Sequence, residues 1–242
     1  MQPSSRTEPE LASSYGLTPS DFDRYARQLA VPELGVLGQR RLKAARVAVV
    51  GAGGLGSPAL SYLAAAGVGT LTVIDADTVA ESNLHRQPLH GQPDLDCLKV
   101  DSAATALKRL NPEVRIERRP IRLIGDNALE LLAGHDAIVD GSDNFDTHYC
   151  LDDAAAELGI PCVWGSVLGW QGQTGVSWAK HGPRYRDLYP LPPDEHETLS
   201  CAGGGVIGTV CGVIGSIMAT QVVKLLAGIG SPQFGTVLFF DG

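Results

Sequence analysis

A glycine-rich segment between a β-rich run and a helical run is the first feature that could carry chemistry. The pattern G-x-G-x-x-G is made by Gly51, Gly53 and Gly56, and Gly54 is a further glycine within it. Backbone amides in such a turn, together with the N-terminus of the following helix, can hold phosphate oxygens. Asp75 ends the next β-rich run, 24 residues after Gly51, where a carboxylate can bond a ribose hydroxyl. These residues predict a nucleotide site and leave NAD and ATP both open.

The cations that follow Asp75 favour a triphosphate. Attack on the α-phosphate of ATP develops charge there and on the departing pyrophosphate, and Arg and Lys side chains stabilise that charge. NAD needs only its pyrophosphate bound and its nicotinamide placed. The candidate nucleotide contacts in this stretch are Asp77, Ser82, Asn83, Arg86, Gln87 and Lys99.

An acidic turn beyond a later β-rich run is the candidate metal site. Mg²⁺ takes few protein carboxylates and completes its shell with phosphate oxygens. Asp143 lies just past the predicted strand end, at the edge of the sheet where α/β folds bind ligands. We therefore expect Asp143 to hold Mg²⁺ through ATP, whereas Asp140, nearer the strand, could instead cap the turn. The five cysteines include no C-x-x-C pair, so neither a zinc site nor a disulfide framework is expected.

Strand-like and helix-like runs alternate along most of the chain, a rhythm typical of a mostly parallel sheet covered by helices. Ser57 is the expected N-cap of the helix after the glycine turn, with Pro58 in its first position. Only a short Gly/Gln-rich segment separates the last two long β-rich runs, which favours antiparallel pairing there. The sequence thus predicts an α/β, Rossmann-like, mostly parallel sheet with an antiparallel C-terminal extension, as one domain over 21–242 after a flexible leader, 1–20. Strands are expected at 46–50, 70–74, 114–117, 137–140, 162–167, 174–179 and 236–240, and helices at 58–66, 99–110, 127–132 and 146–158.

Composition excludes several classes of protein. With a formal charge of -8, the chain lacks the excess of positive residues that nucleic-acid binding needs. Its composition of 44% hydrophobic and 19% charged residues excludes a disordered chain. The apolar run 206–227 is interrupted by Gly208, Gly212 and Gly215, so we expect a buried or subunit-facing helix instead of a membrane span. The polar N-terminus does not look like a signal peptide. We expect a protein of the reducing cytoplasm that binds neither membrane nor nucleic acid.

Taken together, the motifs resemble those of the ubiquitin-activating-enzyme-like adenylyltransferases of the ThiF, MoeB and HesA type. The resemblance is greatest to enzymes that activate sulfur carriers for molybdopterin and thiamine synthesis, and it covers about 21–242. Its motifs are Arg24–Gln28, Gly51–Gly56, Asp75–Asp77, Ser82–Gln87, Asp140–Asn144 and Leu199–Cys201.

The resemblance implies an activity. Such enzymes use ATP and Mg²⁺ to adenylate the C-terminal glycine carboxylate of a small ubiquitin-like sulfur carrier ending in Gly-Gly. They release pyrophosphate and work as homodimers. By matching position, Arg27 would reach the phosphates held by the other subunit, and Cys201 would act in thioester or persulfide chemistry; the other four cysteines are assigned to packing. The implied contacts to ATP or its metal are Gly54, Asp75, Ser82, Asn83, Arg86, Lys99, Asp143 and Asn144.

Three departures from the family pattern qualify this expectation. Arg184–Asp187 occupies the place of a C-x-x-C pair that many relatives carry, which indicates a zinc-free branch. His148 replaces a usual Arg. No rhodanese-like domain follows, so a separate sulfur donor protein is expected. An NAD-dependent oxidoreductase, or an inactive partner subunit of a heterodimeric activating enzyme, are the alternatives that remain open.

Overall fold

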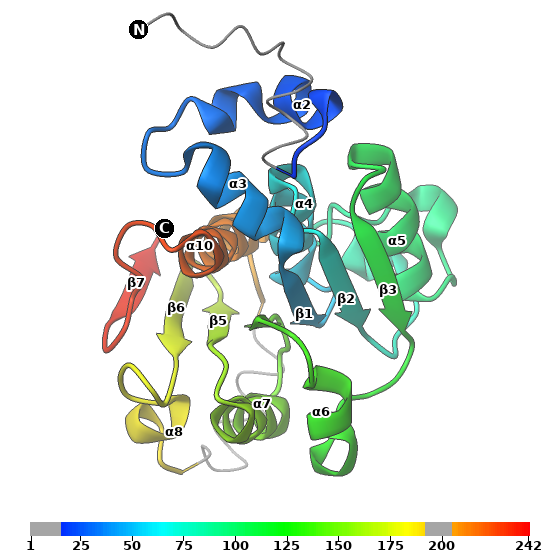
Figure 1. Cartoon of the computed structure of the whole chain (residues 1–242). Coiled ribbons are helices and arrows are strands. Elements are labelled where there is room, and N and C mark those ends of the chain that lie inside the picture. Colours follow the sequence, from blue (N-terminus) through cyan, green and yellow to red (C-terminus); the bar gives the residue numbers. More distant parts are fainter. Residues whose placement is uncertain (1–15, 192–204) are drawn as a thin grey trace, which may run out of the picture.

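The computed structural model describes residues 16–191 and 205–242, which form a seven-stranded sheet of order β3-β2-β1-β4-β5-β6-β7 (Figure 1). The first five strands pair in parallel, whereas β6 and β7 run antiparallel to their neighbours. This arrangement confirms the predicted fold class. The strands are β1 (Arg46–Val50), β2 (Thr70–Ile74), β3 (Arg115–Arg119), β4 (Ala137–Asp140), β5 (Cys162–Leu168), β6 (Gln171–Ser177) and β7 (Val237–Asp241).

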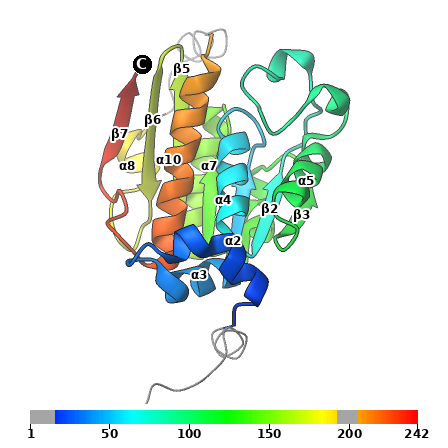
Figure 2. The same cartoon turned by 90° about the horizontal axis from the view of Figure 1, so that it is seen from above.

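Helices cover both faces of the sheet. Figure 2 shows α4 and α10 in front of the strands and α7 behind them. Two short 3-10 turns, 81–83 and 92–94, lie between β2 and α5. The helices are α2 (Pro19–Leu29), α3 (Gly35–Ala44), α4 (Gly56–Ala66), α5 (Lys99–Leu110), α6 (Gly125–Leu132), α7 (Phe145–Leu158), α8 (Tyr185–Leu188) and α10 (Gly208–Ala227).

Two hydrophobic cores follow from the alternation of side chains along each strand. In β1, Val47 and Val49 belong to the core shared with α4, α5 and α10. Ala48 and Val50 belong to the core under α6 and α7. Since both faces are filled with apolar side chains, polar groups for chemistry must gather where the strands end.

The start of α4 differs from the expectation. The helix begins at Gly56 with Leu55 as its N-cap residue, so the prediction that Ser57 caps it is wrong. The Ser57 hydroxyl instead donates to the Ala52 carbonyl oxygen at 3.3 Å and is fully buried. The Ser57 side chain therefore holds the glycine turn against the first turn of α4 instead of capping the helix.

The predicted leader, 1–20, lies mostly outside the described residues. Its last residues belong to the fold, because Leu17 is buried and Thr18 caps α2 in a capping box with Asp21. The long apolar run is the helix α10, which is long and apolar enough to span a membrane by length and composition. Half of that stretch is buried in this structure, and α10 packs on α4, β5 and β6.

Candidate functional site

The glycine loop joins β1 to α4 and touches the acidic turn after β4. Gly51 has φ +89°, and a Cβ there would lie 2.7 Å from the Gly141 carbonyl oxygen. A Cβ on Gly56 would lie 1.8 Å from the Gly51 carbonyl oxygen. Only glycine permits both the backbone conformation and these close approaches. The loop and the acidic turn are thus brought together between β1 and β4, where α4 and α7 leave toward opposite faces of the sheet (Figure 2).

The Gly53 and Gly54 amides of this loop are available to a ligand. The Ala52 amide donates to Asp75 Oδ2 at 2.8 Å, and Asp75 Oδ1 accepts from the Asp77 amide at 2.8 Å. The amides of Gly53 and Gly54 donate to no acceptor within 16–191 and 205–242. Unpaired amides beside the N-terminus of a helix form an anion site.

Two cations and one amide side chain border the loop. Lys99, at the start of α5, is buried and its Nζ lies 2.9 Å from Asp77 Oδ2, the carboxylate being 60% exposed. The Arg86 Cδ lies 3.7 Å from the Cβ position of Gly54, and its Nη1 donates to the Ser82 carbonyl oxygen. The buried Gln87 approaches Gly53 with its Nε2, while its Oε1 has no partner among the described residues. Positive charge and unused polar atoms therefore converge on the glycine loop.

The acidic turn after β4 presents one open carboxylate. Asp140 is buried, and its Oδ1 accepts from the Ser142 amide at 3.1 Å and from the Ser142 hydroxyl at 2.6 Å. Asp140 therefore holds the turn. Asn144 caps α7 by accepting from the Thr147 amide, whereas the Asp143 side chain is exposed beside the loop. In the described part of the chain no three His, Cys, Asp or Glu side chains gather as a metal cluster, so phosphate oxygens would have to complete the shell of a metal ion at Asp143.

His148 pairs with the base of this turn. Its Nδ1 lies 2.5 Å from Asp140 Oδ2, and its ring stacks on Tyr185. Burial opposes a charge on the ring, but the charge and hydrogen bond of Asp140, with the charge of Asp143, outweigh it and raise the pKa of His148. His148, which departs from the expected family pattern, is therefore hydrogen-bonded to Asp140.

The structure does not bring Arg27 to the site of its own chain. Arg27 is exposed on α2, which packs on the last turn of α4: Gln28 donates to the Ala66 carbonyl oxygen at 3.0 Å and Tyr25 contacts Gly67. The glycine loop lies at the other end of that helix, which rises about 16 Å over its length. Cys201 lies outside the described residues.

The remaining cysteines differ from one another. Cys162 and Cys211 are buried as expected, and the Cys211 Sγ lies 3.0 Å from the Cβ position of Gly54. Cys97 is exposed, so its assignment to packing is wrong. It lies two residues before Lys99, in the loop that precedes α5. No apolar pattern in the sequence indicates that this loop lies on the surface.

Comparison with known proteins decides the family. Residues 25–242 match the family described as ThiF. The chain belongs to the ThiF family. It is 46% identical over 237 residues to the probable adenylyltransferase/sulfurtransferase MoeZ of Mycobacterium tuberculosis, covering 96% of this chain and 60% of MoeZ. It is 47% identical over 229 residues to the sulfur carrier protein adenylyltransferase of Thermus thermophilus, covering 93% of this chain and 84% of that protein. The chain thus spans less than two thirds of the length of MoeZ.

A solved structure of a more distant protein shares the fold. The crystal structure of E. coli MccB with ATP superposes with a TM-score of 0.80 at 21% identity, over 90% of this chain and 68% of MccB. MccB therefore shares the arrangement of the sheet and its helices with this chain, although the two sequences differ at most positions.

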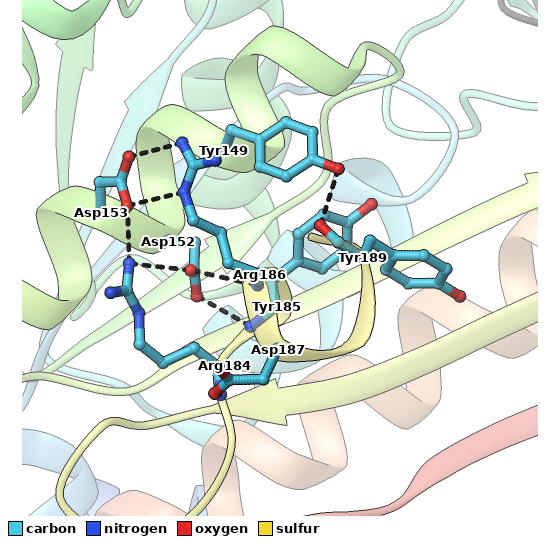
Figure 3. A network of polar contacts seen from close by, with 8 residues as sticks. All are labelled: Tyr149, Asp152, Asp153, Arg184, Tyr185, Arg186, Asp187 and Tyr189. Carbon is cyan, nitrogen blue, oxygen red and sulfur yellow. Dashed lines mark hydrogen bonds and ion pairs between the residues drawn. The ribbon is translucent and has the colours of Figure 1, made fainter. Parts of the chain in front are cut away.

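The segment Arg184–Asp187, which the family resemblance puts in the place of a C-x-x-C pair, is held by ion pairs and aromatic contacts (Figure 3). In α8 and the residue before it, Arg184 contacts both Asp152 and Asp153 of α7, at 3.0 and 2.6 Å. Arg186 binds Asp153 through Nε and Nη2, and its guanidinium lies 4.5 Å from the Tyr149 ring centroid. In this ThiF-family chain, side-chain charge thus fastens α8 to α7.

Proposed function

We propose that this ThiF-family chain catalyses ATP-dependent adenylation of the C-terminal glycine carboxylate of a small ubiquitin-like sulfur-carrier protein, releasing pyrophosphate. The observation that carries the proposal is that the Gly53 and Gly54 amides, which have no acceptor among the described residues, lie with Arg86 and Lys99 at the edge of the sheet where the exposed Asp143 follows β4. Two similar proteins, MoeZ and the Thermus thermophilus relative, are named adenylyltransferases, which supports the proposal.

The arrangement suits a triphosphate better than NAD. Lys99 is a buried ammonium at the edge of the loop, with only the exposed Asp77 as ion-pair partner among the described residues. Arg86 lies over Gly54. A dinucleotide gives neither cation a role, whereas a departing pyrophosphate needs both charges nearby.

The reaction depends on positioning the two reactants and neutralising their charge more than on proton transfer. A glycine carboxylate oxygen of the carrier attacks the α-phosphorus of ATP, and the bond from that phosphorus to the bridging oxygen of pyrophosphate breaks. Both groups are anionic, so their repulsion has to be offset. Arg86 and Lys99 neutralise the phosphates, the Gly53 and Gly54 amides bind phosphate oxygens, and Asp75 approaches the ribose. Mg²⁺ held by Asp143 supplies further charge neutralisation when bound.

The partners and setting are part of the same proposal. The carrier ends in Gly-Gly, a separate protein donates the sulfur, and Cys201 takes part in transfer of the activated carboxyl. The chain works as a homodimer in the cytoplasm, with Mg²⁺ and without zinc, membrane or nucleic acid. Supporting the dimer, Arg27 lies at the far end of α4 from the glycine loop of its own chain.

Exchange of labelled pyrophosphate into ATP tests the proposal. We expect exchange that depends on a Gly-Gly-ending carrier, assayed against a panel of such proteins from the same organism. Asp143→Asn should abolish it, whereas Asp146→Asn, which removes an exposed carboxylate in the first turn of α7, should not. Exchange without any carrier, or with none of the panel, contradicts the proposal, and binding of NADH without ATP favours the oxidoreductase.

Cys201→Ala separates the two steps. Adenylation needs ATP, metal and a carboxylate, so exchange should persist while sulfur transfer to the carrier falls. Loss of exchange in a folded Cys201→Ala protein contradicts the transfer role.

A further inference from the structure

His90 is a buried side chain that connects two parts of the nucleotide site and matches none of the motifs in the sequence. Its Nε2 lies 2.9 Å from the Ala52 carbonyl oxygen in the glycine loop. Its Nδ1 lies 2.8 Å from the Ser102 hydroxyl, one turn after Lys99 in α5. His90 and Ser102 are 5% and 4% exposed. One ring thus connects the glycine loop to α5, the helix that begins with the proposed phosphate-binding residue Lys99.

The partners assign the tautomer of the ring. A carbonyl oxygen only accepts, so Nε2 carries the proton and donates to Ala52, while Nδ1 accepts from the Ser102 hydroxyl. Burial, with Lys99 acting in the same direction, lowers the pKa of His90, so the ring is neutral near pH 7. Asp94 and Asp75 are the acidic groups that act on it in the opposite sense.

This contact orients one peptide of the loop. In a trans peptide the C=O of one residue and the N–H of the next point in opposite directions. The Ala52 carbonyl accepts from His90 Nε2 at 2.9 Å and, at the longer distance of 3.3 Å, from the Ser57 hydroxyl, so the Gly53 N–H points away from the ring, and it has no acceptor in the described ranges. On the other side of Ala52, its own amide is held by Asp75. The two contacts leave the Gly53 amide as the group offered to a ligand.

We propose that His90 is a positioning residue of the ATP site, which sets the Gly53 amide toward the phosphates through the Ala52 carbonyl and ties the loop to the Lys99 helix through Ser102. The proposal rests on the function proposed above. His90 touches no substrate, so its effect falls on ATP affinity, with little effect on turnover at saturating ATP.

The fold offers a matched control in His135. It is also buried, and it also bridges a hydroxyl and a carbonyl, through Nε2 to Thr72 and Nδ1 to Leu132. Its neighbour Asp136 pairs with Arg46 at the amino end of β1, away from the strand ends that form the site. His135→Leu therefore removes the same kind of contacts without touching the loop.

ATP binding by calorimetry on the purified chain, with Mg²⁺ and without carrier, tests the proposal. We expect His90→Leu to weaken ATP binding about tenfold, because the Ala52 carbonyl loses its nearer donor and the Gly53 amide is no longer held toward the phosphates. His135→Leu should bind ATP like the wild type, even if both variants melt at lower temperature. ATP binding by folded His90→Leu equal to that of the wild type overturns the proposal.

A second pair of variants decides the matter if His90→Leu does not fold. The amide nitrogen of Gln corresponds in reach to Nε2, and that of Asn to Nδ1. His90→Gln keeps a donor for Ala52 and should retain wild-type ATP affinity and KM, whereas His90→Asn should raise the KM for ATP in pyrophosphate exchange with kcat little changed. Equal ATP affinity of the two variants overturns the role of His90. A wild type that binds no ATP overturns the proposed function and this inference together.

Discussion

His148 Nδ1 lies 2.5 Å from Asp140 Oδ2, on the inner side of the turn that presents Asp143. Both side chains are almost completely buried, and the other oxygen of Asp140 holds the Ser142 backbone and hydroxyl. The pair therefore links the first turns of α7 to the acidic turn.

The pair makes folding stability depend on pH. The pKa of His148 is raised in the folded chain above its usual value of about 6.5. A raised folded pKa adds stability that is fully present below the unfolded pKa and is lost as pH rises through the folded pKa. We expect the wild type to exceed His148→Asn in free energy of unfolding by the largest margin near pH 6, since Asn can hydrogen-bond but carries no charge.

Urea unfolding of both proteins between pH 6 and pH 9 measures the effect. The difference between them should shrink as pH rises. A margin that stays constant or grows over this range contradicts a charged His148 in the folded state.

Two glycines that each begin a helix should respond in opposite ways to alanine. Gly56→Ala places a Cβ 1.8 Å from the Gly51 carbonyl oxygen, which forces the loop backbone to move. Gly125→Ala, at the start of α6, meets nothing within 4 Å. We expect Gly56→Ala to cost about 2 kcal/mol or more and to abolish ATP binding, whereas Gly125→Ala should change stability by less than about 1 kcal/mol, in the stabilising direction. Urea unfolding and calorimetry measure both, and similar behaviour of the two variants contradicts the close packing of the loop.

Adjacent aspartates in Figure 3 should differ in their contribution to stability. Asp152 is 3% exposed and accepts from the Tyr185 amide as well as contacting Arg184. Asp153 is 53% exposed, although it binds both Arg184 and Arg186. Removing a buried acceptor leaves its donors unpaired at a cost of about 1–3 kcal/mol, whereas a solvent-screened pair contributes about 1 kcal/mol or less.

Asp152→Ala should therefore destabilise the chain more than Asp153→Ala in urea unfolding. The reverse order contradicts the view that burial, more than the number of ion pairs, fixes α8 to α7.

Much of the fold was predictable because its signals are local. Strands buried on both faces are apolar along their length, and β1, β2 and β4 all have this pattern. Parallel pairing then brings the residues after each strand to one edge, which is why Asp75 and Asp143 could be placed near the glycine loop from the sequence.

The rest depends on contacts between distant parts of the chain. His90 meets Ala52 across 38 residues, and Arg184 meets Asp153 across 31. No periodicity or turn signal encodes such pairs. The neighbours of Ser57 alone predict a cap there, but the helix begins earlier, at Gly56, where the close approach to the Gly51 carbonyl oxygen is a contact that no local pattern indicates.

The position of Arg27 leads to a prediction about two subunits. Because α2 packs on the last turn of α4, Arg27 lies away from the loop of its own chain, and the proposed dimer would bring it to the partner's phosphates. Arg27→Ala and Asp143→Ala should each abolish pyrophosphate exchange. A mixed dimer contains one site with both wild-type residues, so an equal mixture after subunit exchange should recover about a quarter of wild-type activity, with half of the dimers mixed and half of their sites intact. Differently tagged chains, purified through both tags, verify the exchange. If purified mixed dimers remain inactive, Arg27 does not act in the partner's site.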